Sequence, residues 1–185
     1  SANAIINCGS RPVFVDINPD TRNIDYKKLE PLISKNTAAI MVVHFSGLSC
    51  EMDKIVKLCK SYKLKLIEDS AETLGGTWKG RQAGSWGVGC FSFFPTKNIS
   101  TGEGGMITCS DKSLVSKFKL MAAHGISTQS IEREKKKSLP WHKIAKLAGH
   151  NYRMSNLLAG LGLEQLKKIK KLNFNRRKSA KLYFK

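Results

Sequence analysis

A lysine lies between an apolar stretch and a glycine-rich turn in residues 91–105, FSFFPTKNISTGEGG. The apolar neighbours of Lys97 are expected to shield it from water, and a shielded amine is a good nucleophile toward aldehydes. Ser92 and Thr96 supply hydroxyl groups that can donate hydrogen bonds to phosphate oxygens. The alternative for any single lysine of this lysine-rich chain is a solvated surface charge, and spacing alone does not exclude it.

Acidic residues end another apolar stretch, in residues 68–75, EDSAETLG. Asp69 is expected at the carboxyl end of a parallel strand, which is where open α/β sheets bind their ligands. A structural aspartate that caps a helix or forms a turn is the alternative for this position.

Strands and helices alternate in the part of the chain that must position these residues. The predicted strands are 11–17, 38–44 and 64–68, and the predicted helices are 26–33 and 52–62. Asp25 is expected to cap the first helix, and the continuous apolar run at 38–44 predicts a strand that is covered on both faces. This order predicts an α/β fold with a mostly parallel sheet.

The second half of the chain has a weaker pattern. Short strands are predicted at 90–94 and 106–109, and a helix capped by Ser110 is predicted to run to residue 123. Residues 124–150 are basic and poorly patterned, which indicates a loop or partial disorder. A long helix is predicted from residue 155 toward the end of the chain.

Composition limits the possible functions. The formal net charge is +18, and basic residues dominate from residue 132 onward. This charge is compatible with nucleic-acid binding, but solvated helix faces are favoured because no nucleic-acid motif or interleaved aromatic residues accompany it. The five scattered cysteines form no CxxC pair and predict reduced thiols, with no metal site. The sequence has no apolar run of eighteen residues, so we expect no membrane span, and it has no leader pattern.

Several long motifs together resemble one enzyme family. They are EDSAETLGG, GxxxGSWG, FSFFPTKNISTGEGG, HGI and GHNYRMSNLLAGLGLEQL, and their order and spacing extend over essentially the whole chain. These motifs resemble the DegT/StrS-type sugar aminotransferases, which depend on pyridoxal 5'-phosphate and have the aspartate aminotransferase fold (fold type I).

The resemblance implies a three-layer α/β/α large domain that is truncated at both ends, because the family's chains are about twice as long. Residues 1–153 would form part of the cofactor-binding large domain. Residues 154–185 would form a long helix that leads toward a C-terminal small domain. A fragment of this kind is expected to be incomplete as a catalyst.

The resemblance also implies a set of cofactor-binding residues. Lys97 matches the Schiff-base lysine, and Asp69 matches the carboxylate that pairs with the pyridine nitrogen and keeps it protonated. Four further matches complete the set: Ala71 on the ring face, Glu72 near the ring hydroxyl, Ser92 at the phosphate, and Asn151 at the phosphate of the neighbouring subunit's cofactor. The role of Asn151 requires a homodimer with shared active sites.

Other motif residues have weaker assignments. His124 is more simply explained by a structural role. Tyr152 and Arg153 flank Asn151, where they could contact an anionic substrate or pack in the interior.

The implied reaction is amino transfer from glutamate to a nucleotide-linked keto-sugar, in the biosynthesis of a polysaccharide or glycoside. A cytoplasmic enzyme without nucleic-acid or membrane partners is expected. Related sugar 3-dehydratases have histidine at position 97, so the lysine favours amino transfer. The remaining alternatives are an inactive or regulatory cofactor-binding relative and a basic nucleic-acid-binding module.

Overall fold

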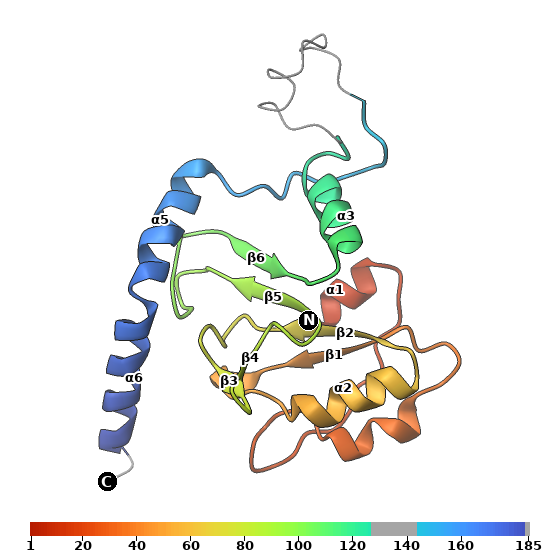
Figure 1. Cartoon of the computed structure of the whole chain (residues 1–185). Coiled ribbons are helices and arrows are strands. Elements are labelled where there is room, and N and C mark those ends of the chain that lie inside the picture. The colour runs from red at the N-terminus through yellow and green to blue at the C-terminus, as the bar shows by residue number, and fades with distance from the viewer. Residues whose placement is uncertain (127–143, 184–185) are drawn as a thin grey trace. The chain divides into compact units, whose positions relative to one another are not determined.

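The computed structural model describes residues 1–126 and 144–183. Figure 1 shows the chain coloured from red at the N-terminus to blue at the C-terminus. The chain divides into two compact units. The larger, which we call the sheet unit, comprises Ser1–Thr108 and Asn156–Lys185, and the smaller, the small unit, comprises Cys109–Ser155.

A four-stranded sheet forms the centre of the sheet unit, in the order β1-β2-β5-β6. Its strands are β1 (Ala39–Val43), β2 (Lys65–Asp69), β5 (Val88–Ser92) and β6 (Gly105–Thr108). The first three are parallel and β6 is antiparallel to β5. The predictions of an α/β class and a mostly parallel sheet are therefore confirmed.

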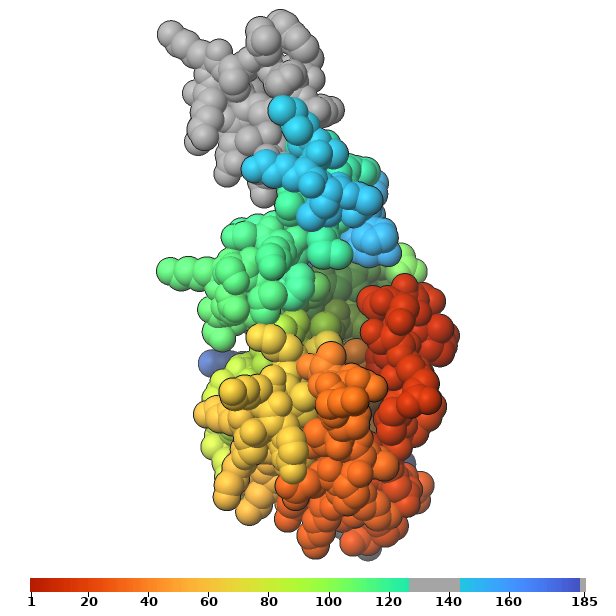
Figure 2. Space-filling model, turned by 90° about the vertical axis from the view of Figure 1, so that its right-hand side faces the viewer, coloured from red at the N-terminus to blue at the C-terminus, as the bar shows by residue number. Residues whose placement is uncertain are grey.

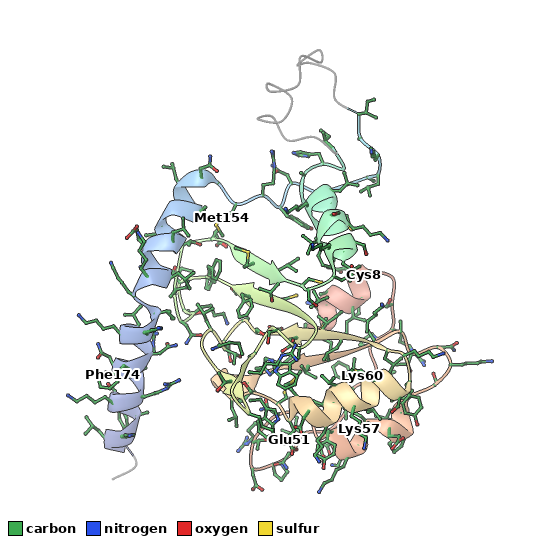
Figure 3. The ribbon with its side chains drawn as sticks, in the orientation of Figure 1. Cys8, Glu51, Lys57, Lys60, Met154 and Phe174 are labelled. Atoms are coloured by element: carbon green, nitrogen blue, oxygen red, sulfur yellow. The ribbon has the colours of Figure 1, made fainter. Side chains whose placement is uncertain are left out.

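Helix α2 (Met52–Ser61) connects β1 to β2 and confirms the helix predicted at 52–62. Its residues Met52, Ile55 and Cys59 are buried, and they belong to one apolar cluster with Ile40, Val42 and Leu66 of the sheet. The polar face of the helix carries Lys57 and Lys60, which are labelled in Figure 3. The helical spacing of the apolar residues predicted this helix correctly, because the apolar face of α2 covers the sheet.

The prediction that β1 is covered on both faces is wrong. Ile40 and Val42 are buried, but Val43 is 40% exposed and Ala39 is also exposed. Side chains of a strand alternate between the two faces of a sheet, so the described residues cover only one face of β1.

The prediction of a strand at residues 11–17 is also wrong. Val13 and Phe14 are 56% and 77% exposed, and among the described residues the segment pairs only through an isolated bridge between Ile17 and Ile24. Figure 2 shows the N-terminal residues, in red, on the outside of the sheet unit beside the orange segment that follows them. Apolar composition favours a strand only where a partner strand is available, and in the described residues this segment has none.

Short helices precede β1. Helix α1 (Ala2–Asn7) opens the chain, and η1 (Tyr26–Lys28) and η2 (Glu30–Leu32) replace the single helix predicted at 26–33. Asp25 accepts a hydrogen bond from the backbone N–H of Lys27 at 3.0 Å, which confirms it as the cap. A proline in η2 helps to explain the interruption, because proline cannot donate a helical hydrogen bond.

In the small unit, α3 (Lys112–Ala122) begins one residue later than predicted. Asp111 caps it by accepting hydrogen bonds from the backbone of Ser113 and Leu114, so the prediction of Ser110 as the cap is wrong. Residues 127–143 of the predicted loop lie outside the described residues. In residues 144–150 the only regular feature is a bridge between Ile126 and Ala145.

The predicted C-terminal helix is divided into α5 (Asn156–Lys167) and α6 (Ile169–Tyr183). Both belong to the sheet unit. That residues 154–185 lead toward a further domain stays a prediction. None of the helices in the described part of the chain is long and apolar enough to cross a membrane.

Candidate active site

The carboxyl ends of three parallel strands meet at one edge of the sheet. Val43 at the end of β1 is in register with Asp69 at the end of β2, and Asp69 is in register with Cys90 of β5. Ser92 ends β5 at the same edge. This is the edge at which α/β sheets bind ligands, so the strands place Asp69 and Ser92 where the sequence predicted chemistry.

The carboxylate of Asp69 is held from two directions. Its Oδ2 accepts a hydrogen bond from the hydroxyl of Ser1 at 2.5 Å, and its Oδ1 accepts one from the backbone N–H of Ala71 at 3.2 Å. Ser1 occupies the N-cap position of α1, yet its side chain does not cap that helix. The hydroxyl instead orients Asp69, a contact over 68 residues for which the sequence carries no signal.

Lys97 lies in a loop that is held in place by a backbone hydrogen bond and by buried residues. The backbone N–H of Lys97 donates to the carbonyl of Phe94 at 3.0 Å, which closes a turn directly before the lysine. Beyond it, Ile99 and Thr101 are 4% and 1% exposed, and they anchor the loop to the interior. The side chain of Lys97 is 21% exposed, so the solvated surface charge considered for this residue does not describe it.

Glu72 connects the loop after β2 with the lysine. Its Oε1 lies 3.4 Å from Nζ of Lys97, and its Oε2 accepts a hydrogen bond from the backbone N–H of Ser46 at 2.9 Å. Because Glu72 is 45% exposed, this ion pair contributes only roughly 0–1 kcal/mol to stability. Its importance is geometric, since it places a carboxylate beside the candidate nucleophile.

A buried carboxylate organises the loops around the site. Glu68 is fully buried and accepts four hydrogen bonds, from the ring of His44 at 3.2 Å and from the backbone of Gly84, Trp86 and Gly87 at 2.7 Å each. Burial raises the pKa of Glu68, but the hydrogen bonds from His44 and the three backbone groups together outweigh it and hold the pKa below its ordinary value.

The ring of His44 completes this network. The backbone N–H of Cys50 donates to Nδ1 of His44 at 3.2 Å, so the ring proton lies on Nε2, which donates to Glu68. The carbonyl of His44 accepts the hydroxyl of Thr73 at 3.2 Å. His44 and Glu68 therefore connect the ends of β1 and β2 to three loops. Neither residue was predicted as part of the site, because no motif or spacing in the sequence distinguishes His44 or Glu68.

Replacing Glu68 with glutamine is expected to lower the free energy of unfolding by about 3–5 kcal/mol. The amide nitrogen would face two N–H donors in either orientation, and each buried donor without an acceptor costs roughly 1–3 kcal/mol. Urea denaturation of the purified protein measures the change. Glu51→Gln is the matched control, because the Glu51 side chain makes no capping hydrogen bond, and its effect should stay within about 0.5 kcal/mol. Equal stability of the two variants would contradict the assigned network.

The small unit contains the remaining predicted residues. Asn151 is exposed and forms an isolated bridge with Ala123, and the ring of Tyr152 stacks on His150 with 4.6 Å between centroids. His124 has a left-handed backbone (φ 58°), and its N–H donates to the carbonyl of His150 at 2.8 Å. These contacts favour a structural role for His124. The role of Asn151 stays a prediction.

The chemical groups at the sheet edge suit pyridoxal phosphate. Lys97 offers an amine to an aldehyde, and Asp69 offers an oriented carboxylate to a protonated pyridine nitrogen. Ser92, whose Oγ accepts the backbone N–H of Phe94 at 3.3 Å, retains its own proton for a phosphate oxygen. The family resemblance of the sequence motifs implies the same cofactor for these three residues.

Comparison with known sequences gives a consistent result. The model of the DegT/DnrJ/EryC1/StrS aminotransferase family matches residues 1–185. GDP-perosamine synthase of Caulobacter vibrioides is 43% identical over 170 residues, which are 91% of this chain and 43% of that protein. The spore coat polysaccharide biosynthesis protein SpsC of Bacillus subtilis is 39% identical over 184 residues, 99% of this chain and 47% of that protein. The chain thus spans about half the length of the relatives it matches.

Solved structures resemble the chain as well. PseC of Helicobacter pylori, an aminotransferase involved in the biosynthesis of pseudoaminic acid, has a TM-score of 0.83 and 35% identity, over 91% of this chain and 43% of that one. Spr1654 of Streptococcus pneumoniae in its PMP-form has a TM-score of 0.87 and 28% identity, over 98% of this chain and 50% of that one. A PLP-form of Spr1654 matches with a TM-score of 0.78 and 28% identity, over 91% of this chain and 46% of that one.

Proposed function

Because the chain belongs to the DegT/DnrJ/EryC1/StrS aminotransferase family, we propose that the protein transfers an amino group from glutamate to the keto group of a nucleotide-linked sugar. The amino acid leaves as its oxo acid and the keto-sugar becomes an amino sugar. The observation that carries the proposal is that Asp69 ends β2 and that Glu72, three residues later, contacts Lys97 in the loop after β5. The relatives are about twice as long, so the proposal concerns the whole protein of which this chain is a matching part.

Lys97 and Asp69 have separate roles in this proposal. Bound pyridoxal phosphate supplies an electron-accepting ring and an aldehyde carbon. Lys97 would hold the cofactor through Nζ, and as a free amine it would move a proton from the α-carbon of the amino donor, first as a base and then as an acid. Asp69 would accept a hydrogen bond from the protonated pyridine nitrogen and so keep the proton on it in both halves of the reaction. The 2.5 Å hydrogen bond from Ser1 keeps this carboxylate in a fixed orientation.

The remaining predicted residues would orient the cofactor. Ala71 offers a small side chain against the ring face, and Ser92 a hydroxyl to the phosphate. Glu72 places a carboxylate near Lys97, where it can keep the free amine within the site. Asn151 would reach the phosphate of a neighbouring subunit, so we propose a homodimer, which we place in the cytoplasm.

The names of several relatives support the class of substrate. One relative from Campylobacter jejuni, 41% identical over 173 residues, is a UDP-4-amino-4,6-dideoxy-N-acetyl-beta-L-altrosamine transaminase. GDP-perosamine synthases also match, from Caulobacter vibrioides and Escherichia coli O157:H7. These names share a sugar attached to a nucleotide, and they support that class of acceptor without selecting one sugar.

An absorbance titration tests the proposal. The purified protein is mixed with pyridoxal phosphate, and a visible band of the covalently bound cofactor is expected. Addition of glutamate should convert this band to the ultraviolet band of the aminated cofactor and release one equivalent of 2-oxoglutarate. Absence of the first band would contradict cofactor binding. A stable first band without oxo acid would identify an inactive or regulatory relative.

A further inference from the structure

We propose that Asn173 and Arg176 of α6 form a clamp that sets the distance between the two loops carrying Glu72 and Lys97, and so position the lysine for amino transfer. This inference rests on the proposed function of the site. It assigns a role to two residues that lie far from the cofactor-binding motifs in the sequence.

Each residue of the clamp holds one loop. Nδ2 of Asn173 donates to the carbonyl of Leu74 at 3.0 Å, in the loop after β2. Nη2 of Arg176 donates to the carbonyl of Asn98 at 2.7 Å, in the loop after β5. The two side chains also join each other, because Nη1 of Arg176 donates to Oδ1 of Asn173 at 3.2 Å. The three hydrogen bonds form one continuous connection between the loops.

The clamp acts on the segments that carry the chemistry. Leu74 follows Glu72 by two residues, and Asn98 follows Lys97 directly. Glu72 and Lys97 contact each other at 3.4 Å across the same two loops. The loops are therefore joined at two places, through this ion pair and through the helix. The hydrogen bond from Arg176 to Asn98 is 2.7 Å long, whereas the ion pair between Lys97 and Glu72 is 3.4 Å long, so the helix connection includes the closer contact.

The backbone beside Asn173 leaves room for its hydrogen bond to Leu74. Gly75 has a φ of +90°, and a side-chain Cβ at that position would lie 2.5 Å from Nδ2 of Asn173. A glycine therefore permits both the turn and the close approach of the amide. Asn173 and Arg176 are three residues apart, so they share one face of α6. The next residue after Asn173, Phe174, is 66% exposed and is labelled on this helix in Figure 3.

Substitutions on one helix turn test the proposal. Arg176→Ala is expected to lower kcat about 10-fold or more, with the KM for glutamate within about two-fold of wild type. The visible cofactor band should form more slowly after addition of pyridoxal phosphate, because Lys97 is less well oriented. Arg177→Ala is the matched control, because it removes the same side chain from the neighbouring position, which is exposed like Arg176. It should leave kcat, the KM for glutamate and the rate at which the band forms unchanged.

Two further variants separate positioning from loss of structure. Arg176→Lys can donate to the carbonyl of Asn98 but cannot reach Asn173 at the same time, so it should restore part of kcat. Asn173→Ala combined with Arg176→Ala should lose less than the product of the two separate losses, because both act through one connection. These comparisons use thermally stable, folded variants, and Arg176→Lys replaces Arg176→Ala if the latter does not fold.

The outcomes distinguish this inference from the proposed function. A wild-type protein without a cofactor band would overturn the proposed function and the clamp with it. A wild-type protein with a normal band and turnover, together with equal values for Arg176→Ala and Arg177→Ala, would overturn only the clamp. Equal kcat for Arg176→Lys and Arg176→Ala, together with losses that multiply fully in the double variant, would also contradict it.

Discussion

Replacing Lys97 with alanine is expected to abolish the visible absorbance band of the bound cofactor. The rate of amino transfer should fall by at least about 10³-fold. The variant removes the amine that binds the aldehyde carbon and also the base that moves the proton. The ion pair to Glu72 is lost, but it contributes little to stability because Glu72 is 45% exposed. The variant should therefore remain folded while it loses covalent cofactor binding and amino transfer.

Lys60→Ala serves as the control for this prediction. Lys60 is exposed on α2, and Figure 3 shows its place away from the loop that carries Lys97. Absorbance spectra with pyridoxal phosphate and a coupled assay for 2-oxoglutarate measure both variants. An unchanged band and normal turnover in Lys97→Ala would mean that another amine has the assigned role.

Replacing Asp69 with asparagine is expected to leave the covalent cofactor band in place while amino transfer falls roughly 10²–10³-fold. Asparagine has nearly the same size, but its neutral amide cannot hold a proton on the pyridine nitrogen. The hydroxyl of Ser1, which now donates to a carboxylate at 2.5 Å, would also lose its charged acceptor. Binding and chemistry should thus separate in this variant, unlike in Lys97→Ala.

Single-turnover mixing with glutamate measures this effect, because it follows the chemical step and not product release. Asp20→Asn is the control, since Asp20 is an exposed turn residue outside the sheet edge. Wild-type rates for Asp69→Asn would show that the carboxylate has only a structural role, which was the alternative considered for this position.

Adjacent carboxylates on β2 have different environments. Successive side chains of a strand point to opposite faces, so Glu68 and Asp69 are separated although they are neighbours in sequence. Glu68 is fully buried and accepts four hydrogen bonds, whereas Asp69 is partly exposed at the strand end. The acidic pair that looks like one motif in the sequence is thus one structural acceptor and one candidate cofactor ligand.

Sequence periodicity predicted the elements whose partners are close in the chain. Helix α2 packs against the strands that precede and follow it, so the apolar spacing of Met52, Ile55 and Cys59 was enough to predict it. The segment 11–17 has the same apolar character but no partner strand among the described residues, and the prediction of a strand there was wrong. Local pattern indicates which face is apolar and does not indicate whether another element covers it.

The sequence predicted the site less completely. The motifs identified Lys97, Asp69 and Glu72, and the structure places Glu72 beside Lys97. The residues that orient them were missed, because their contacts span 68 residues for Ser1 and 99 for Asn173. Hydrogen bonds over such separations depend on how the chain folds back on itself, which no spacing in the sequence records.

Reduction of the protein with borohydride in the presence of pyridoxal phosphate, followed by peptide mass spectrometry, tests the central claim most directly. Reduction makes the bond between the cofactor and its lysine permanent. A phosphopyridoxyl group is expected on the peptide that contains Lys97, at one equivalent per chain, and it should disappear when glutamate is added before reduction. A modification on a different lysine, or one spread over many lysines and insensitive to glutamate, would contradict the assignment of this site.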